Sequence, residues 1–477
     1  MKFTVNKFLI FLIILIGTSI IIYSIKSDKK LSINNDLFNK IDKLQNEINS
    51  NQKKIEELND EIYFRDIKLE KWDQKFNLIS KYYKPYENDL ILKKDLNDIT
   101  FKKNKSFKTN KDKFELNLFS PYENNFLTGI SFKMPGSAYF EIFEENIYMI
   151  SNIGITSYAF LDDTQDKIRF KQIENNLNEF IGLKQFSKAK NHYWFGFKDL
   201  LISRGKIFVS YTFEMQEDCF GIGILQADLN TETLKFEKFF STNECITNKS
   251  SLGEEFNAHQ SGGRIIELEN NILLSVGDFR QRGNAQNLNS HFGKLILIED
   301  NNSYNIISLG HRNIQGLSYL KELNILISTE HGPQGGDEIN LIDLNSQEIP
   351  NFGWPISSYG EHYGGKNNPL NYDKYQKFPL HKSHKDYNFI EPLKYFVPSI
   401  GISDIKRLNN DLFIMGSMRN ESFYLIDINF RQNKINRIDQ YFIGERIRDI
   451  AINNEFILLY LETTGSIAFI NKAKLIN

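Results

Sequence analysis

Apolar residues follow three different patterns along the 477 residues of this chain. The first is a run without charged residues from Phe8 to Ile25, about the length needed to cross the apolar core of a bilayer. No small-x-small cleavage site follows this run, and no cysteine lies near it for lipid attachment. We therefore expect a membrane anchor over residues 1–30 rather than a cleaved signal peptide, while lysines on both sides of the run leave its orientation open.

The second pattern is a heptad repeat that follows the apolar run. Apolar residues recur every seven positions, and a second apolar set occupies the alternate core position. The two sets are Ile41, Ile48, Ile55, Ile62 and Leu69, and Leu37, Leu44, Leu58 and Trp72. Asn51 and Arg65 interrupt the second set. The repeat predicts a short coiled-coil stalk within residues 31–80 that joins copies of the chain into a homo-oligomer. A lone amphipathic helix packed on the following domain is the alternative.

The third pattern begins after a Lys- and Asn-rich linker, which we place at residues 81–109. From residue 110 to 477, short runs rich in β-branched and aromatic residues recur, separated by turn signals such as Glu269-Asn270-Asn271. Helical periodicity is almost absent from this part of the sequence. So many short antiparallel strands predict an all-β domain, and a β-propeller accommodates them more naturally than a sandwich. An array of several sandwiches is the structural alternative.

Composition narrows the class of protein. Hydrophobic residues make up 41% of the chain, enough to bury a large core, and the formal net charge is -2. Because the chain has no basic excess, we expect no nucleic-acid partner. The two cysteines, Cys219 and Cys245, flank the open end of a predicted hairpin with strands at 221–229 and 234–240. They form a disulfide or remain separate thiols, and the disulfide requires an oxidising compartment.

Two turns present polar groups that suit catalysis or anion binding. Arg312 and Asn313 lie in a turn between two apolar runs. His259 precedes a Gly pair in the segment AHQSGGR. A single His in such a place is more often a turn residue with one hydrogen bond than a catalytic base, so this second signal is weak by itself.

A further turn suits a metal ion. Gly332 and Pro333 begin a glycine-rich turn whose carbonyl oxygens cannot all pair with a strand. The carboxylates of Asp337 and Glu338 follow directly. Oxygen ligands of these two kinds are typical of sites for a hard cation such as calcium.

Five short motifs occur in a fixed order between His259 and Pro355. They are HQSGGR, VGD, GHRN, EHGPQGGDEIN and NFGWP, at hairpin spacing. This ordered set resembles the soluble glucose/sorbosone dehydrogenase family, and the resemblance extends over about Asp199 to Leu475. Members of that family are six-bladed β-propellers that use pyrroloquinoline quinone and calcium. The resemblance therefore implies an all-β, six-bladed β-propeller that oxidises a sugar.

The resemblance also implies roles for individual residues. His259 falls at the position of the general base, and Arg312 at that of the cation that stabilises negative charge on a quinone oxygen. Contacts to the quinone are expected from Arg312, Asn313, Arg446, Arg448 and Arg419, the last of which replaces a Lys of the family. Contacts to calcium are expected from the carbonyls of Gly332 and Pro333, while Asp337 and Glu338 either bind a second, structural calcium or pair with nearby amides. Gln260 and Asp278 are expected to face the substrate.

The match is weaker where the family holds its sugar. Ala258 replaces an acid that precedes the catalytic His, and residues 192–195 offer no clear Gln. The leading hypothesis is a single-pass, inner-membrane-anchored dehydrogenase with its catalytic domain in the periplasm, which oxidises an aldose or a related hydroxylated substrate and passes electrons to an unidentified acceptor. A calcium-dependent, lactonase-like hydrolase and a non-catalytic binding propeller on a stalk are the alternatives.

Overall fold

The computed structural model describes residues 43–52, 54–55, 99–103, 107–108, 115–122, 137–161, 166–181, 196–247, 256–301 and 303–476. The chain divides into two compact units, Met1–Tyr63 and Phe64–Asn477. In the first unit, residues 43–52 and 54–55 are helical, and Leu44, Ile48 and Ile55 of the predicted heptads are exposed. Among the described residues, no helix has the length and apolar character to span a membrane. The predicted anchor and most of the predicted stalk lie outside the described residues.

The described strands of the second unit form five sheets, the largest of 11 strands. Because β1 bridges two four-stranded groups within that largest sheet, we describe the unit as six antiparallel groups, here called blades. Blade 1 contains β4 (Ala138–Phe143), β5 (Asn146–Ser151), β6 (Thr156–Phe160) and β7 (Lys167–Asn175). Blade 2 contains β8 (Gly196–Ser203), β9 (Lys206–Gln216), β10 (Cys219–Asp228) and β12 (Glu237–Ser241), with β13 (Ile246–Thr247) paired to β10. Blade 3 contains β14 (Gly262–Leu268), β15 (Asn271–Val276), β16 (Lys294–Ile298) and β17 (Tyr304–Leu309).

The remaining blades follow the same plan. Blade 4 contains β18 (Ile314–Leu320), β19 (Ile325–Glu330), β20 (Asp337–Asp343) and β21 (Lys394–Phe396). Blade 5 contains β22 (Ile402–Arg407), β23 (Leu412–Ser417), β24 (Ser422–Asn429) and β25 (Lys434–Phe442). Blade 6 contains β26 (Ile447–Ile452), β27 (Phe456–Leu461) and β28 (Ser466–Asn471), and its outer strand is β3 (Glu115–Tyr122).

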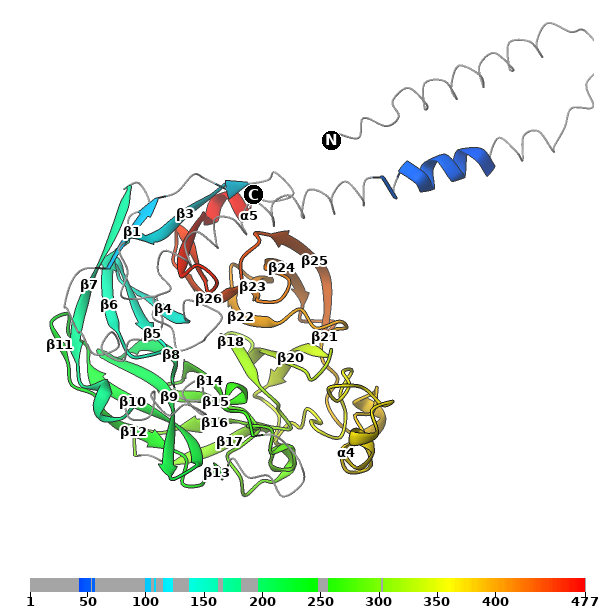
Figure 1. Cartoon of the computed structure of the whole chain (residues 1–477), viewed down its shortest axis with the longest axis horizontal. Coiled ribbons are helices and arrows are strands. Elements are labelled where there is room, and N and C mark those ends of the chain that lie inside the picture. The colour runs from blue at the N-terminus through cyan, green and yellow to red at the C-terminus, as the bar shows by residue number, and fades with distance from the viewer. Residues whose placement is uncertain are drawn as a thin grey trace, which may run out of the picture. The chain divides into compact units, whose positions relative to one another are not determined.

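The blades form a closed ring. The innermost strands β4, β8, β14, β18, β22 and β26 each contact the next, and β26 contacts β4. Figure 1 shows the sheets arranged around a common centre. Strands from the two ends of the second unit complete blade 6, because β28 near the C-terminus pairs with the early strand β3 in the register Ile467↔Phe119. This architecture confirms the prediction of an all-β, propeller-type domain.

Short elements complete the unit. Strand β1 (Ile99–Lys103) pairs with β3 and β7, β2 (Phe107–Lys108) pairs with β3, and β11 (Thr233–Leu234) pairs with β7. The helical segments are η1 (Leu177–Glu179), η3 (Ala258–Gln260), η4 (Arg282–Gln286), η5 (Pro369–Asn371), α4 (Tyr372–Lys377), η6 (Lys385–Tyr387) and α5 (Lys472–Ile476). Because β1 joins blades 1 and 6, paired structure begins before the expected domain boundary at residue 110.

Local turn chemistry explains why these strands form hairpins. Between β14 and β15, Glu269 has φ 49° and Asn270 has φ 67°. Two successive positive φ values are typical of the type I′ turn, whose twist matches that of the flanking strands. The apolar faces of the blades then pack on one another, as in the cluster that joins Phe197, Phe220 and Leu274 from neighbouring blades.

The two cysteines are joined in a disulfide. Strands β10 and β12 pair as a hairpin with the register Gly223↔Ser241, so the chain that leaves β12 returns to the start of β10. Cys219 and Cys245 meet there, with their Cα atoms 5.3 Å apart and their sulfurs bonded. Of the two alternatives left open by the sequence, the structure has the disulfide.

Candidate functional site

His259 lies in a short turn that leads into blade 3. The turn is η3 (Ala258–Gln260), and the Oδ1 of Asn257 caps it by accepting the His259 amide hydrogen at 2.8 Å. Gly262, at the start of β14, adopts φ 68° and donates its N–H to Asn313 Oδ1 at 3.0 Å. The structure therefore fastens the His259 turn to the Arg-Asn turn of blade 4, which lies far from it in sequence.

The surroundings of His259 keep its imidazole neutral. Its side chain is exposed, yet the protein around it removes much of its hydration. This desolvation, together with the positive charges of Lys198 and Arg448, lowers the pKa of His259 to about 4. A neutral imidazole at neutral pH has a lone pair with which to accept a proton.

Arg312 is held in place by a tryptophan and a backbone carbonyl. It is 4% exposed, and its Nη1 donates to the carbonyl oxygen of His331 at 2.9 Å. Its guanidinium lies 5.4 Å from the ring centroid of Trp354, the Trp of the NFGWP motif. The Arg312 amide also donates to the carboxylate of Glu330. These contacts give the side chain a single fixed direction.

Asp278 is hydrogen-bonded to both Trp354 and the backbone of Arg312. Its Oδ2 accepts the indole N–H of Trp354 at 2.8 Å, its Oδ1 accepts the amide of Arg280 at 2.9 Å, and its own amide donates to the Arg312 carbonyl at 2.9 Å. Burial raises its pKa, and the residue is 0% exposed. Oδ2 thus orients Trp354 and Oδ1 holds the Arg280 amide, so both oxygens have donors within the protein, and a contact of Asp278 with the substrate stays a prediction.

Gln260 has a free acceptor. It is 6% exposed, and its side-chain Oε1 accepts no hydrogen bond from the described residues. A buried acceptor without a donor is costly, so this oxygen suits a donor brought by a ligand.

A hydrogen-bonded path joins the Arg-Asn turn to the arginines of blade 6. Asn313 is 5% exposed, and its Oδ1 accepts a second hydrogen bond from Gln315 Nε2 at 3.1 Å. The Oε1 of Gln315 lies 3.5 Å from Arg448 Nη1. The side-chain oxygen of Asn313 therefore accepts two hydrogen bonds within the protein, and these connect Gly262 of blade 3 with Gln315 of blade 4.

Arg446 and Arg448 share one buried carboxylate. Arg446 Nε lies 3.0 Å from Glu462 Oε2, and Arg448 Nε lies 2.9 Å from Glu462 Oε1. Burial by itself would raise the pKa of Glu462, but Arg448 and Arg446 outweigh it and lower the pKa to about 2. The two guanidinium groups, 27% and 16% exposed, are thus fixed side by side with a net positive charge.

The Gly332-Pro333 turn presents backbone carbonyl oxygens that suit a cation. A Cβ on Gly332 would lie 2.1 Å from the carbonyl oxygen of Gly336, so only glycine fits. The Gly332 amide donates to Asp337 Oδ1 at 3.1 Å, and neither the Gly332 nor the Pro333 carbonyl accepts a hydrogen bond from the described residues. Two carbonyl oxygens without donors suit a cation.

Asp337 and Glu338 differ from each other. Asp337 receives hydrogen bonds from Gly332, from Ser399 Oγ at 2.8 Å and from the amide of Gly401 at 2.7 Å. Its carboxylate therefore links blade 4 to the turn that leads into blade 5, and it has little capacity left for a metal. Glu338 instead lines a narrow cavity together with Arg312, Gly332 and Trp354.

Two acidic side chains and two histidines line this cavity, and Glu330 already accepts hydrogen bonds from His311 and from the Arg312 amide. His384 Nε2 lies 3.5 Å from Glu338 Oε1, and Glu330 also lines the space. Burial, and then the neighbouring charge of Glu330, raise the pKa of Glu338. A buried carboxyl group is costly in its charged form unless a cation or hydrogen-bond donors compensate it. The described residues nevertheless contain no group of three or more His, Cys, Asp or Glu side chains arranged to hold a metal ion.

Arg419 lies at the exposed end of blade 5. Its amide donates to the Ile400 carbonyl at 3.0 Å, and its side chain makes no hydrogen bond or ion pair with the part of the chain that the structure describes. Met418, the residue before it, accepts hydrogen bonds from Arg446 at its carbonyl and its sulfur. The turn is therefore next to the paired arginines.

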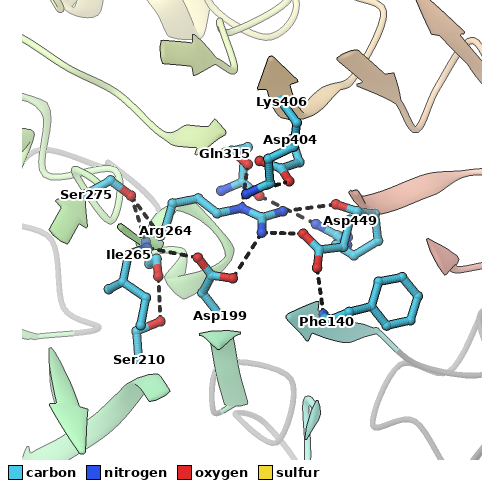
Figure 2. A network of polar contacts seen from close by, with 12 residues as sticks. Phe140, Asp199, Ser210, Arg264, Ile265, Ser275, Gln315, Asp404, Lys406 and Asp449 are labelled. Carbon is cyan, nitrogen blue, oxygen red and sulfur yellow. Dashed lines mark hydrogen bonds and ion pairs between the residues drawn. The ribbon is translucent and has the colours of Figure 1, made fainter. Parts of the chain in front are cut away.

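Arg264 supports the site from the centre of the ring (Figure 2). Its Nη1 contacts the carboxylates of Asp199, at 3.1 Å, and Asp449. Its Nε donates to the Gln315 carbonyl at 2.6 Å, and its Nη2 to the Arg448 carbonyl at 3.1 Å. One buried side chain thus joins blades 2, 3, 4 and 6, and it holds the backbone of Gln315, which links Asn313 to the arginine pair, and that of Arg448.

Sequence reasoning missed Glu462, Arg264, Gln315 and Lys198. For Glu462 a signal was available, because a hairpin that turns at Asn453 places Glu462 opposite Arg446, whose carbonyl accepts its amide at 2.8 Å. No local pattern identifies Arg264, because its carboxylate partners lie 65 and 185 residues away.

Comparison with known proteins identifies the family of this chain. Residues 197–469 match the family model for Glucose / Sorbosone dehydrogenase. The match covers more than half of the chain, and the chain belongs to this family.

Curated relatives are similar over part of their length. Aldose sugar dehydrogenase YliI of Escherichia coli (strain K12) is 28% identical over 242 residues, which is 46% of this chain and 60% of the relative. An uncharacterized protein, slr1608, of Synechocystis sp. is 30% identical over 220 residues, 40% of this chain and 50% of the relative. The chain thus spans about half to three fifths of the length of these relatives.

Solved structures show the fold. The soluble aldose sugar dehydrogenase from Escherichia coli, in the apo-form, has a TM-score of 0.54 at 18% identity and covers 70% of this chain and 95% of its own. The PQQ-bound form of aldose sugar dehydrogenase from Streptomyces coelicolor has a TM-score of 0.50 at 17% identity, with 70% and 94% covered.

Proposed function

We propose that this protein is a calcium- and pyrroloquinoline quinone-dependent dehydrogenase that oxidises a hydroxyl group of an aldose or a related compound. The observation that carries the proposal is the path from Arg448 through Gln315 and Asn313 to Gly262, three residues after His259. Because of this path, the proton acceptor and the fixed cations belong to one site rather than to separate blades.

The residues present fit the quinone. The molecule carries three carboxylates, and guanidinium groups bind carboxylates through paired hydrogen bonds. The Nη groups of Arg446 and Nη1 of Arg448 do not bond Glu462 and have only long contacts, of 3.5 to 3.6 Å, with Met418 and Gln315. Arg419 adds a third, exposed guanidinium. The names of an aldose sugar dehydrogenase and a quinoprotein glucose dehydrogenase among the relatives support the same substrate class.

The Gly332-Pro333 carbonyls fit the metal. They have no hydrogen-bond donors among the described residues, and Gly332 lines the cavity beside Arg312. Glu338 in the same cavity fits the second, structural calcium better than Asp337 does, because Asp337 is saturated by amides and a hydroxyl. When bound, the quinone supplies a two-electron acceptor and calcium supplies Lewis-acid polarisation of its carbonyl groups.

The chain's own residues supply the rest of the chemistry. His259 accepts the hydroxyl proton of the substrate at a ring nitrogen, since its imidazole is neutral. Arg312, fixed over Trp354, presents a positive charge where negative charge develops. The unpaired Oε1 of Gln260 accepts a hydrogen bond from another hydroxyl of the substrate. The buried Trp354 excludes water from one side of the site.

The deciding experiment is a titration of the full chain with the quinone and Ca²⁺, followed by dye reduction over a panel of aldoses. We expect saturable quinone binding that EGTA reverses and dye reduction that requires both additions. If the quinone does not bind, the proposal fails. If it binds without dye reduction, the binding-propeller hypothesis replaces it, and lactone hydrolysis without quinone would favour the hydrolase.

We also propose that the catalytic unit lies outside the cytoplasm, attached to the membrane by residues 1–30 and joined to other copies by the heptads of residues 31–80. The disulfide between Cys219 and Cys245 supports the location, because disulfides persist in oxidising compartments. The exposed Leu44, Ile48 and Ile55 support self-association. Fractionation of cells and light scattering of the purified chain test the two parts, and a monomer in the supernatant would contradict both.

A further inference from the structure

Lys294 is a fully buried lysine at the start of β16. It is 0% exposed, and its Nζ donates to three backbone carbonyl oxygens, those of Asn284 at 2.7 Å, Ala285 at 3.0 Å and Phe292 at 2.9 Å. All three ammonium hydrogens are thus used. A buried ammonium is costly unless it is fully hydrogen-bonded, so the three carbonyls form a cage specific for a cation.

The cage holds η4, which connects β15 to the rest of blade 3. Asn284 and Ala285 belong to η4, and the Ala285 carbonyl also accepts the amide of Gly310 at 3.0 Å. Gly310 lies two residues before Arg312. The ammonium therefore fixes the carbonyl of η4 that also binds the segment carrying Arg312, the proposed catalytic arginine.

The same helix holds the tryptophan on which Arg312 lies. Gln286 Nε2 donates to the Trp354 carbonyl at 2.7 Å and to Asn351 Oδ1 at 3.1 Å. Ala285 packs in one apolar cluster with Trp354 and Leu380. Two independent connections therefore run from η4 to the Arg312-Trp354 pair, one through the backbone of Gly310 and one through Gln286.

We propose that Lys294 is a positioning residue: its buried ammonium fixes η4 through three backbone carbonyls, and through η4 it sets the positions of Trp354 and Arg312. The statement about the active site rests on the proposed function, but the effect on Trp354 does not require it. Lys294 touches neither substrate nor cofactor in this arrangement.

The test is a chemical rescue of Lys294→Ala in the full chain. The substitution removes a propylammonium-sized group and leaves the carbonyl cage, so added n-propylammonium can restore the missing cation. Two readouts are measured: the dissociation constant of the quinone with Ca²⁺, and Trp354 emission in a background with Trp72→Phe and Trp194→Phe. Lys321→Ala, at an exposed lysine of the β18–β19 turn, is the matched control.

We expect Lys294→Ala to weaken quinone binding about tenfold, the effect of losing roughly one charge-assisted hydrogen bond, and to shift Trp354 emission to longer wavelength. n-Propylammonium should reverse both changes, whereas tetramethylammonium, which has no N–H donor, should reverse neither. Lys321→Ala should match the unsubstituted protein in both readouts.

The proposal is overturned if Lys294→Ala folds with unchanged Trp354 emission and unchanged quinone affinity. If Lys294→Ala does not fold, Lys294→Met, which retains the apolar stem, is measured for quinone affinity and Trp354 emission without added ammonium, and the same two changes are expected. Failure of both variants to fold, even with n-propylammonium, would show that Lys294 serves the fold alone and would also overturn the proposal. If the unsubstituted protein does not bind the quinone, the proposed function fails, while the rescue of Trp354 emission still decides the role of Lys294.

Discussion

Arg448 and Arg446 grip the same carboxylate from two sides, with Arg448 Nε 2.9 Å from Glu462 Oε1 and Arg446 Nε 3.0 Å from Glu462 Oε2. Glu462 is 5% exposed as a side chain, so the pairing takes place away from bulk water. One negative charge thus fixes two positive charges and leaves one of them uncompensated. The site is pre-organised for an anion before any ligand arrives.

Glu462→Gln should therefore destabilise the protein. Removing the charge leaves two partly buried arginines without an anion, and breaking a buried pair costs about 3 kcal/mol. Urea unfolding should show this loss, and the quinone should stabilise the variant more than the unsubstituted protein because its carboxylates replace the lost charge. Glu455→Gln, at an exposed position of the β26–β27 turn, is the control. Equal unfolding free energies for Glu462→Gln and Glu455→Gln would show that the contacts of Glu462 with the two arginines do not stabilise the protein.

Arg264→Met should be more damaging than its size suggests. The guanidinium compensates Asp199 and Asp449, whose side chains are 8% and 2% exposed, so the substitution removes the ion-pair partner of two buried carboxylates and leaves the charge of Lys406 to act on them alone. We expect a loss of about 4 kcal/mol in the free energy of unfolding. Arg264→Met combined with Asp449→Asn should recover part of this loss, because it also removes one uncompensated charge. A double variant as unstable as the sum of both single variants would show that charge is not the cause.

His259→Gln tests the proton acceptor. Glutamine has similar bulk but no basic nitrogen, and general-base catalysis is commonly worth about 10² to 10⁴ in rate. We expect dye reduction to fall by about three orders of magnitude, with the dissociation constant of the quinone nearly unchanged. Retained turnover would remove His259 from the mechanism, and lost quinone binding would instead make it a cofactor contact.

The pKa of His259 should rise when the quinone binds. Desolvation and the charges of Lys198 and Arg448 lower it to about 4 in the free protein, because positive neighbours disfavour the imidazolium. Carboxylates bound beside these cations oppose that effect, so the acid limb of turnover should lie above pH 4. NMR titration of the His259 ring with and without quinone measures both values, and His259→Gln assigns the signal. A pKa that falls on binding would place the carboxylates elsewhere.

The disulfide should stabilise blade 2 without affecting the site. Its half-cystines are 26 residues apart, and closing a loop of this size stabilises a protein by about 3 kcal/mol. Cys219→Ser with Cys245→Ser should lower the free energy of unfolding by about that amount and leave quinone affinity unchanged. If the folded variant binds the quinone more weakly than the unsubstituted protein, the disulfide of blade 2 also influences the site.

Much of the architecture was predictable because it depends on local pattern. Alternating apolar residues and turns such as Glu269-Asn270 determine where hairpins form, and the hairpin registers then follow. The motif turns around His259, Arg312 and Gly332 were recognisable for the same reason, since a tight turn requires particular residues at particular positions.

The roles of single side chains were less predictable. Asp278 and Asp337 resemble ligand-binding acids in the sequence, and in the fold Asp278 accepts a hydrogen bond from Trp354 and Asp337 from Ser399, contacts that no local pattern indicates. Which of two neighbouring acids is saturated depends on amides that only the folded chain brings near.

The sequence by itself determined the all-β class, the order of the hairpins and the residue types of the site, because propensity and turn chemistry act over a few positions. Only the tertiary structure decided that Glu462 clamps two arginines, that Arg264 joins four blades and that Lys294 fills a carbonyl cage. The physical reason is that a buried charge is stable only when its partners surround it, and closure of the ring supplies those partners from distant parts of the chain.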